Sequence, residues 1–479
     1  MGWSLPDIPE KDKGRQWSPW FCLLIIFSGF FLALIIVMLD SPAGSLLSLG
    51  SSHLLPLALQ TVIGCFAAVA VYTFCWEIQE FVVWRWNSWR QNMNLLWYRR
   101  AHQHHFISFH DTLTANSQLL PKIAGVVSDD GDEKLPLTLL PGESLTPGIS
   151  RFEQLCRLLL TRVPLSFLQK HSDNLTVLLH TSSRDNEAEL RAFHRLWASE
   201  KLPGSPNILI SPNEFSFRDW NQRVVAASGY ILVLAMHYRQ PDESLPEIAS
   251  VLLFTPSSLI AQNERKKFPR LFRAMPLRSD AMRHELNEWH DIGQQPLDKK
   301  YLVWYSGLNT ACQQGLRGVL NALPLPLIDD IGVGGVINFD KDFGVYGSLA
   351  GWLMIAAACE MTRYGPSKQL LLYENENEGW AVTLGDSSPV IDPALQVYSP
   401  APFPAGSMML ALLFSGSIFG LMIHSCPSVA YSWSGITVFS TTLVVTLPGI
   451  AILVRNITTN LLHPRFIKAA RQSGKESPE

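Results

Sequence analysis

The sequence predicts a membrane protein in which two transmembrane helical hairpins flank one large α/β domain. Two observations carry this prediction. Four apolar segments without an internal charge lie in two pairs, one near each end of the chain, and the long polar segment between the pairs alternates strand-like with helix-like patterns. Each apolar segment has close to the ~20 residues that a helix needs to cross the hydrocarbon core of a bilayer.

The four predicted spans are residues 20–39, 54–76, 405–423 and 434–454. They form a first hairpin over residues 20–76 and a second hairpin over residues 405–454. No span carries an ionisable residue at mid-depth, whereas transporters use such residues as ion and proton pathways. The spans therefore indicate membrane anchors and argue against a transporter.

The distribution of basic residues predicts the orientation. Lys and Arg occur in the N-terminal segment 1–19, directly after the second span, and in the tail 455–479, but not in the short loops 40–53 and 425–433. Because Lys and Arg are retained on the cytoplasmic side of a membrane, we expect both termini and the long middle segment in the cytoplasm. The expected location is the inner membrane of a Gram-negative-type bacterium.

The net charge and the cysteine spacing limit which partners and which covalent chemistry the sequence supports. The formal net charge is −3, so the chain has no basic footprint for nucleic acid. The seven cysteines are scattered and form no CxxC pair, which is typical of a reduced domain without a disulfide framework. Membrane lipid and a protein on the cytoplasmic side are the expected partners, and a homodimer is left open.

The second span is followed by the segment 77–127, which is rich in Trp, Arg and His. From Glu77 to about His110 we predict a basic, aromatic juxtamembrane helix on the cytoplasmic leaflet. Acidic, Gly and Pro residues then dominate residues 128–149, and this composition is typical of a linker. The α/β domain is expected over residues 150–400.

Within the α/β domain, short apolar runs alternate with helix-like segments. Strands are predicted at residues 175–180, 208–211, 230–237, 250–254, 301–305, 369–373 and 380–384, with a Gly-rich turn into a further strand at 332–339. Helices are predicted at residues 187–200, 310–322 and 349–362. Such alternation predicts a mixed or parallel sheet that helices cover on both faces.

Two segments in the second half of this domain carry a resemblance to a known family. Ser306–Thr310 (SGLNT) follows a predicted strand, and Gly344–Gly351 (GVYGSLAG) opens a helix of small residues that two closing strands follow. This order is similar to the C-terminal half of the thiolase-like superfamily, the β-ketoacyl synthases in particular, which carry H-G-T-x-T and G-H-x-x-G-A-A-G at these places. The resemblance covers residues 301–386 and extends to the first half by strand order alone. It implies a layered domain of two βαβ-type halves.

The departures from the family pattern bear on activity. Ser306 stands where the family has its first histidine, and Val345 stands where it has the second. In the family these imidazoles act on the substrate, whereas a valine can neither donate a hydrogen bond nor transfer a proton. The resemblance therefore implies a catalytically inactive domain, a pseudoenzyme.

A condensing enzyme also needs a reactive thiol. Cys156 and Cys359 lie inside predicted helices, where nothing activates a thiolate. Cys312 lies at a predicted helix start directly after SGLNT, and it is the one cysteine whose position could lower its pKa. Cys312 is therefore the only candidate nucleophile, and we expect no catalytic set around it.

The densest group of potential metal ligands is His102, His104, His105 and His110. Imidazole is the commonest ligand for transition metals, and membrane desaturases also combine four spans with histidine boxes. Those enzymes need several such boxes, however, and this chain has one imperfect cluster. We favour a polar segment at the level of the lipid headgroups, and we expect no metal and no cofactor.

A basic cluster precedes the second half of the domain. Its members are Arg265, Lys266, Lys267, Arg270 and Arg273. Such a cluster could bind an acidic partner or lipid headgroups, but a solvated helical face is the more common outcome and is the interpretation that we favour.

The function that these observations predict is a non-enzymatic scaffold or adapter of the inner membrane. The combination of membrane anchors and an inactive domain also resembles the accessory and effector-adapter proteins of bacterial type VI secretion clusters, which implies a role in secretion and virulence. The alternative is a membrane-bound acyl-transfer or condensing enzyme that acts on acyl chains near the bilayer and uses Cys312.

Overall fold

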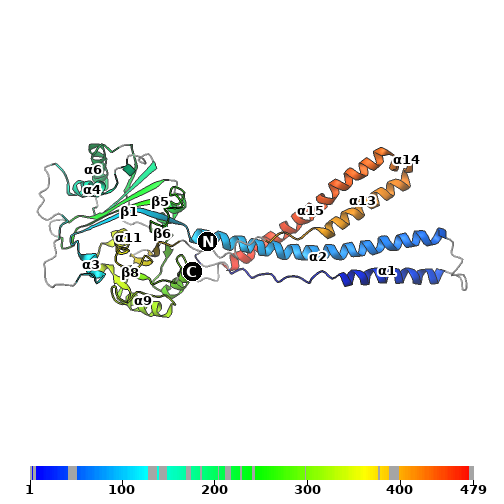
Figure 1. Ribbon diagram of the computed structural model, residues 1–479, viewed down its shortest axis with the longest axis horizontal. Helices are drawn as coiled ribbons and strands as arrows, with labels where there is room; N and C mark the ends of the chain where they lie inside the picture. Colours follow the sequence, from blue (N-terminus) through cyan, green and yellow to red (C-terminus); the bar gives the residue numbers. More distant parts are fainter. Residues whose placement is uncertain are drawn as a thin grey trace. The chain divides into compact units, whose positions relative to one another are not determined.

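The computed structural model consists of two compact units, formed by Met1–Leu96 with Asp392–Glu479 and by Trp97–Ile391 (Figure 1). The residues that it describes are 3, 7–40, 51–127, 137–139, 148–164, 166–168, 174–183, 186–202, 204–210, 217–226, 229–239, 243–296, 298–375, 378–387 and 399–473. Most of the predicted linker 128–149 lies outside these residues. Each unit is considered by itself below.

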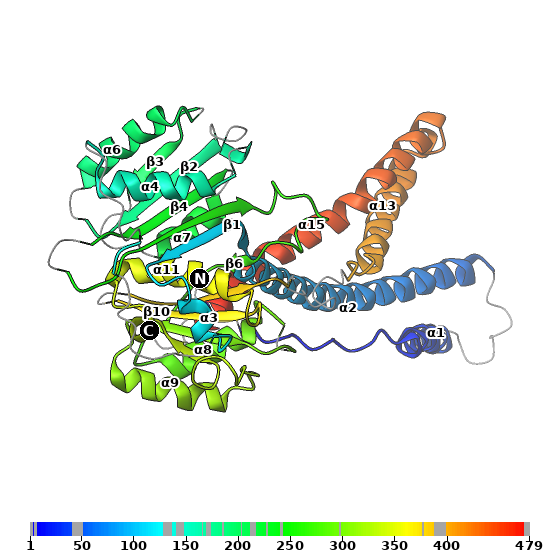
Figure 2. The same cartoon turned by 60° about the vertical axis from the view of Figure 1, so that its left-hand side comes forward.

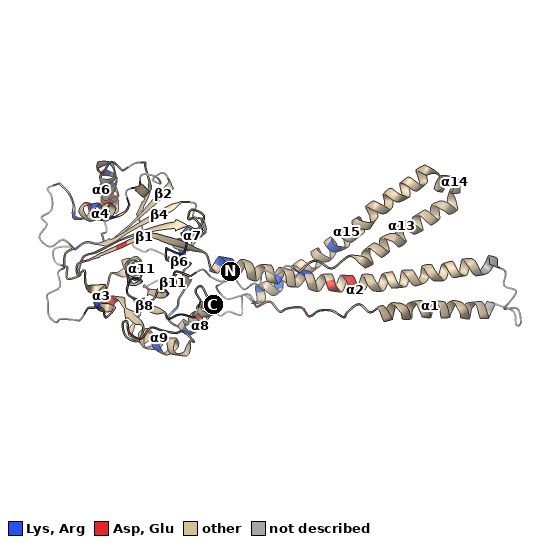
Figure 3. Ribbon diagram, viewed as in Figure 1, with Lys and Arg blue, Asp and Glu red and all other residues tan. Residues whose placement is uncertain are grey.

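The first unit is built from long apolar helices. Its helices are α1 (Pro19–Asp40), α2 (Ser51–Ala101), α13 (Ala405–Ser425), α14 (Pro427–Ala430) and α15 (Trp433–Ser473). The four long helices are each long and apolar enough to cross a membrane. The four predicted spans are therefore confirmed in length and composition. In α2 and α15 the first charged residues are Glu77 and Arg455, and both helices continue well beyond them (Figure 3).

The two hairpins meet where α2 packs against the first turn of α13. Glu77 is 1% exposed, and its two carboxylate oxygens accept hydrogen bonds from the Ser407 amide at 2.8 Å and the Ser407 hydroxyl at 2.7 Å. A carboxylate at this place satisfies an amide that a helix N-terminus leaves unpaired, and it complements the helix dipole. Gly406 lies against the backbone of Phe74, so the two helices approach closely.

A second contact ties the N-terminal segment to α2 and α15. Ile8, Trp86, Leu462 and Phe466 form a buried apolar cluster. The Trp86 indole N–H donates to the Pro9 carbonyl at 3.0 Å, so the aromatic side chain buries its ring and still satisfies its polar group. Trp86, which follows the second predicted span, therefore packs inside the unit.

The second unit contains two halves with the same strand order. The first half consists of β2 (Leu175–Thr181), α6 (Asn186–Ser199), β3 (Asn207–Ile210), α7 (Phe217–Ala226), β4 (Tyr230–His237) and β5 (Ile248–Pro256). Strand β2 is parallel to β3 and β4, and β5 closes the half antiparallel to β4, in the order β3-β2-β4-β5. Helix α4 (Arg151–Arg162) packs against α6 and begins with a capping box formed by Ser150 and Glu153.

The second half repeats this pattern. It consists of β8 (Leu302–Ser306), α9 (Thr310–Ala322), β9 (Val336–Asn338), α10 (Phe339–Asp342), the 3₁₀ turn η2 (Gly347–Leu349), α11 (Ala350–Met361), β10 (Gln369–Glu374) and β11 (Gly379–Gly385). Strand β8 is parallel to β9 and β10, and β11 is antiparallel to β10, in the order β9-β8-β10-β11. The equal order in both halves confirms the prediction of two βαβ-type halves.

Strands β1 (His104–Thr114) and β6 (Arg270–Phe272) join the halves, because they lie next to each other between β5 and β11. A further short strand, β7 (Met275–Pro276), pairs with β11, and α3 (Leu119–Ile123) and α8 (Met282–Ile292) complete the unit. Helices α4 and α6 lie on one outer side, α8 and α9 lie on the other, and α11 lies between the two halves (Figures 1 and 2).

Helix α11 is the centre of the second unit. All twelve of its residues are buried, and it packs against strands of both halves. Its composition explains this position, because Ala and Gly let a helix approach a sheet closely and Trp352 fills the space that remains. The largest apolar core of the unit surrounds α11 and α7, and a second core lies under α4 and α6.

The structure corrects two expectations for the segment before this domain. Helix α2 ends at Ala101, and the residues from His104 to His110, predicted as part of a juxtamembrane helix, form strand β1. The compact α/β unit therefore begins near Trp97 and not at residue 150. Residues 104–114 alternate aromatic, β-branched and polar side chains, and that pattern forms a central strand once β5 and β6 provide partners on both edges.

The basic cluster is also not a solvated helical face. Arg270 lies in β6 and is 2% exposed, and Arg273 follows that strand and is 6% exposed. Arg265, Lys266 and Lys267 lie in the turns that lead into β6. The prediction was wrong because pairing with β1 and β11 turns a short basic segment into a buried strand.

Candidate functional site

The candidate site lies where the parallel strands of both halves end. The segment Asp340–Ser348, which leads into α11, receives contacts from the ends of β2, β4, β8 and β10. In open α/β sheets ligands bind outside the carboxyl ends of the strands. This place is therefore the first in the unit to examine for chemistry, and it contains both Ser306 and Val345.

The Ser306 hydroxyl forms a hydrogen bond that stabilises the turn after β8. Its hydroxyl, in a side chain that is 2% exposed overall, donates to Asp340 Oδ1 at 2.6 Å. The Gly307 amide donates to Asp340 Oδ2 at 2.6 Å, so both carboxylate oxygens hold the turn after β8. Gly307 has a φ of +78°, which only glycine adopts without strain, and this turn directs the chain into α9.

Val345 lies at the tip of the segment and offers no chemistry. It is 68% exposed, and it follows Gly344, whose φ is +120°. The next residue, Tyr346, turns inward and donates its hydroxyl to the Pro246 and Phe343 carbonyls at 3.0 and 3.2 Å. The segment is thus anchored by Tyr346 and presents an apolar side chain to solvent.

Two histidines that are far apart in the sequence meet this segment from the first half. His180, near the end of β2, is 1% exposed, and its Nε2 lies 3.3 Å from the Ser348 hydroxyl. Burial lowers the pKa of His180 to about 4, so the ring is neutral at pH 7. His237, the last residue of β4, packs edge-on against Tyr346 with 5.4 Å between the ring centroids.

His180 and His237 belong to no motif that the sequence alone singles out. Each lies at or next to the carboxyl end of a correctly predicted strand. That position was the available signal, because the ends of adjacent parallel strands meet at one edge of a sheet. What the sequence did not show was that β2 and β4 are adjacent and that Ser348 would face them.

The three cysteines of the α/β unit differ in exposure. Cys156 and Cys359 are completely buried, and burial raises the pKa of both thiols, so they are poor nucleophiles. Cys312 is partly exposed in the first turn of α9, where its amide donates to the side chain of the N-cap Asn309 at 2.9 Å. Cys312 therefore remains the only accessible thiol of this unit.

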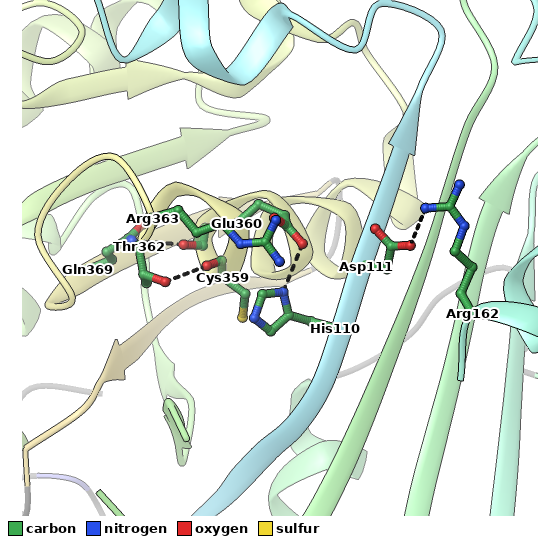
Figure 4. Close-up of polar contacts among 9 residues, drawn as sticks. His110, Asp111, Arg162, Cys359, Glu360, Thr362, Arg363 and Gln369 are labelled. Atoms are coloured by element: carbon green, nitrogen blue, oxygen red, sulfur yellow. Dashed lines mark hydrogen bonds and ion pairs between the residues drawn. The ribbon is translucent and has the colours of Figure 1, made fainter. Parts of the chain in front are cut away.

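The predicted histidine cluster is dispersed by the fold. His102 bridges the Tyr98 and Gly293 carbonyls at 2.7 and 3.1 Å, and His105 packs against Trp220. His110 on β1 lies 3.0 Å from Glu360 on α11, and Figure 4 shows Asp111 on the opposite side of the strand. Within the described ranges, no three His, Cys, Asp or Glu side chains converge in a way that would hold a metal ion.

The burial of His105 has a consequence for stability. Burial is the main cause that lowers its pKa from 6.5 to about 4; the neighbouring His104 adds to this shift, and the Thr255 backbone opposes it. As the pH falls, the unfolded chain protonates His105 near pH 6.5, whereas the folded chain protonates it only near pH 4. The contribution of the neutral, buried ring to the free energy of unfolding is therefore complete above about pH 6.5 and is lost as the pH falls toward 4. We expect His105 to lower the free energy of unfolding by an amount on the order of 3 kcal/mol over this pH range.

The measurement is chemical unfolding of the α/β unit, within the full chain, between pH 4 and pH 7. His105→Gln should flatten the dependence, because the amide does not titrate. His284→Gln serves as the control, since the His284 side chain is 48% exposed. An unchanged slope in His105→Gln would show that other groups dominate the acid sensitivity.

One small cavity lies beside the segment Asp340–Ser348. Its volume is about 70 Å³, and Asn116, Glu247, Asp342 and Tyr346 contribute to its lining. Burial raises the pKa of Asp342, whereas nearby Lys341 lowers it less. Ligand pockets usually measure ~300 Å³ or more, so this cavity is too small for an acyl chain or a cofactor.

Comparisons with known proteins give matches to solved structures alone: no protein-family model and no curated protein matches this chain. OleA of Xanthomonas campestris with bound cerulenin has a TM-score of 0.38 and 10% identity, and the match covers 60% of this chain and 98% of that one. The type II polyketide ketosynthase AntDE in complex with its acyl carrier protein has a TM-score of 0.39 and 8% identity, with coverages of 60% and 99%.

The ishigamide ketosynthase/chain length factor has a TM-score of 0.37 and 12% identity, with coverages of 59% and 98%. Since all these TM-scores are below 0.5, the likeness carries no argument about what this chain binds or does. The similar structures are of the thiolase-like, ketosynthase type that the sequence predicted for the α/β unit.

Proposed function

We propose that this protein is a non-enzymatic scaffold of the bacterial inner membrane, whose α/β unit binds a protein partner on the cytoplasmic side. In this proposal the chain acts as an adapter in a secretion apparatus. One observation carries the proposal. Condensing chemistry of the resembled family needs two imidazoles at the carboxyl ends of the strands. In this chain the first place is taken by Ser306, whose hydroxyl donates to Asp340, and the second by the exposed Val345.

The remaining groups support the absence of condensing chemistry. Covalent catalysis by a thiol usually relies on a neighbouring general base that forms the thiolate. Cys156 and Cys359 are buried and held as thiols. No hydrogen bond or ion pair in the described part of the chain joins Cys312 to a histidine, so no base is positioned to activate it.

The membrane unit supports a role in anchoring. Its two hairpins are fastened to each other through Glu77 and Ser407 and through the cluster around Trp86, so they form one anchor that both chain ends share. The basic flanks of the spans place the α/β unit in the cytoplasm under this proposal. A partner would then be recruited to the inner face of the membrane.

The test is a crosslinking pull-down from native membranes with a tag at the C-terminus, read by mass spectrometry. We expect enrichment of a specific cytoplasmic protein of a secretion apparatus or one of its effectors. Val345→Asp should lose that protein, because a charge would replace the exposed apolar side chain at the site. Val126→Asp is the matched control, since Val126 is also exposed, at 63% against 68% for Val345. Recovery of no specific protein would contradict the proposal.

A second candidate function is acyl transfer, and one observation favours it. The Ser348 hydroxyl lies 3.3 Å from His180 Nε2 directly before α11, and a neutral imidazole can accept a hydroxyl proton. Under this alternative, acyl-thioester and fluorophosphonate probes would label Ser348, or Cys312 in the case of a thiol nucleophile. Labelling that disappears in Ser348→Ala or Cys312→Ser would replace the scaffold proposal with this one.

A further inference from the structure

The small cavity beside the segment Asp340–Ser348 is lined by parts of both halves and of the join between them. It measures about 70 Å³ and lies where the end of β1, the start of β5 and the end of α10 meet. Leu119, Ile248 and Phe343 are among the apolar residues that line it. Since a water molecule needs ~10–15 Å³ of such a volume, the cavity has room for about five non-hydrogen atoms. That is the size of one amino-acid side chain.

Asp342, the last residue of α10, brings an uncompensated carboxylate to this cavity. Its side chain forms no hydrogen bond and no ion pair within the described part of the chain. Burial raises the pKa of Asp342, because the carboxylate is partly removed from water, and the exposed Lys341 opposes this effect only in part. Removing a charge from water without a partner is costly. Among the described residues, no contact offsets that cost.

The other polar groups at the cavity can accept hydrogen bonds but have few protons left to donate. The Thr114 hydroxyl donates its proton to the Asn116 carbonyl at 2.6 Å, and the Tyr346 hydroxyl donates to two backbone carbonyls. Both hydroxyl oxygens can still accept. The Asn116 side chain, whose Oδ1 accepts from the Gln118 amide at 3.0 Å, is the remaining donor among the lining side chains. This set of groups favours a ligand that donates hydrogen bonds.

The uncompensated charge at the cavity is that of Asp342 alone. The second carboxylate in the lining, Glu247, is 2% exposed and paired with Arg151, whose Nη2 lies 2.5 Å from Glu247 Oε2. Glu247 also accepts from the backbone amides of Leu139 and Arg239, so both of its oxygens are occupied. The negative charge that remains attracts a single positive charge.

We propose that the cavity binds the side chain of a lysine that the protein partner of the scaffold presents. An ammonium group donates hydrogen bonds and accepts none, which matches Asp342 and the two hydroxyl oxygens. The aliphatic stem of a lysine can pack against Leu119 and Phe343, and the whole side chain has about the size of the cavity. The site rests on the scaffold proposal, because the lysine belongs to the partner. Tyr346, which lines the cavity, directly follows the exposed Val345, so one partner can contact both.

The first experiment is zero-length carbodiimide crosslinking in native membranes, which joins a carboxylate to an amine in contact with it, followed by pull-down through the C-terminal tag. We expect a peptide in which Asp342 is joined to a lysine of the partner. Asp342→Asn keeps the size of the side chain and removes its charge. It should lose the crosslink and reduce recovery of the partner at least about tenfold, because charged hydrogen bonds are lost.

Asp329→Asn is the matched control, since the Asp329 side chain is 81% exposed on the same unit. This control should recover the partner as the natural protein does. Undiminished recovery of the partner with Asp342→Asn would overturn the lysine site and leave the scaffold proposal standing.

A second experiment tests the cavity without the partner. It is thermal unfolding of the full chain in detergent, with n-butylammonium replacing sodium at constant ionic strength. A ligand that binds the folded state alone raises the unfolding temperature with its concentration. We expect n-butylammonium to raise it relative to tert-butylammonium, which has the same charge in a branched shape unlike a lysine side chain. The natural protein and Asp329→Asn should show this rise, and Asp342→Asn should not.

Lys341→Gln provides a change in the opposite direction. The Lys341 side chain is exposed, and its positive charge acts on Asp342. Its removal should let the protein respond at lower n-butylammonium concentrations, because a like charge no longer repels the ligand.

The two experiments separate a failure of this site from a failure of the scaffold. If the natural protein responds to n-butylammonium through Asp342 but recovers no specific protein, the scaffold proposal and the lysine are both contradicted, and the cavity is a site for a small free amine. If the natural protein does not respond, or if the response persists in Asp342→Asn, the cavity is not an ammonium site and the inference is overturned.

Discussion

Replacing Gly406 by alanine is expected to destabilise the unit of long apolar helices by about 3 kcal/mol, since overpacking costs ~1–3 kcal/mol and the hydrogen bonds of a buried carboxylate are disturbed as well. A Cβ atom at Gly406 would lie 2.3 Å from both the backbone nitrogen and the Cα of Phe74. These are backbone atoms of α2 that cannot rotate away. The helices must therefore separate, and the bonds between Ser407 and Glu77 lengthen or break.

The measurement is unfolding by increasing SDS in mixed micelles. Gly416→Ala is the matched control, because Gly416 lies in the same helix and a Cβ there would meet nothing within 4 Å. Alanine in a helix is more stable than glycine by ~1 kcal/mol, so this control should be neutral or slightly stabilised. Equal effects of the two substitutions would show that α13 does not pack against α2 through Gly406.

Replacing Trp220 by alanine is expected to destabilise the α/β unit by about 4 kcal/mol, the cost of removing a large aromatic side chain from a core. Trp220 on α7 is fully buried. Its ring lies 5.6 Å from Trp352 of α11 and 4.6 Å from Phe254 of β5, as measured between centroids. The cavity left behind would lie between α7, α11 and β5, where the surrounding core cannot collapse to fill it.

Urea unfolding followed by circular dichroism measures this loss. Trp220→Phe is the conservative control, because the Trp220 indole N–H has no hydrogen-bond partner among the described residues and only volume is lost. That variant should cost less than half as much as Trp220→Ala. A double-mutant cycle with Trp352→Ala should show coupling of about 1 kcal/mol or more, as expected for residues in contact. Additive effects would mean that the two helices do not support each other.

Much of the fold follows from local patterns in the chain. The apolar runs that predict strands at residues 175–180 and 230–237 coincide with β2 and β4, and the helix predicted at 310–322 coincides with α9. These elements have strong local signals: continuous β-branched and aliphatic runs for buried strands, and an Asn N-cap with helical periodicity for α9. The segments SGLNT and GVYGSLAG also lie where the resemblance implied, after β8 and before α11.

Other elements were missed because their signals are not local. Strand β6 has three residues, and its sequence indicates a basic surface segment until β1 and β11 pair with it. Strand β1 contains the histidines that indicated a metal cluster or a headgroup segment. In both cases every partner strand lies more than 100 residues away in the chain. No property of the segment itself reveals those partners.

The sequence by itself determined the four long apolar helices and the presence of Ser306 and Val345 where the resembled family has histidines, since these follow from composition and from residue identity. Only the tertiary structure decided that His180 faces Ser348, that Asp340 binds the turn after β8, and that Arg270 is buried in a central strand. The physical reason is that pairing and burial depend on which distant strands become neighbours. That choice is made by the packing of the two halves around α11, and no single segment encodes it.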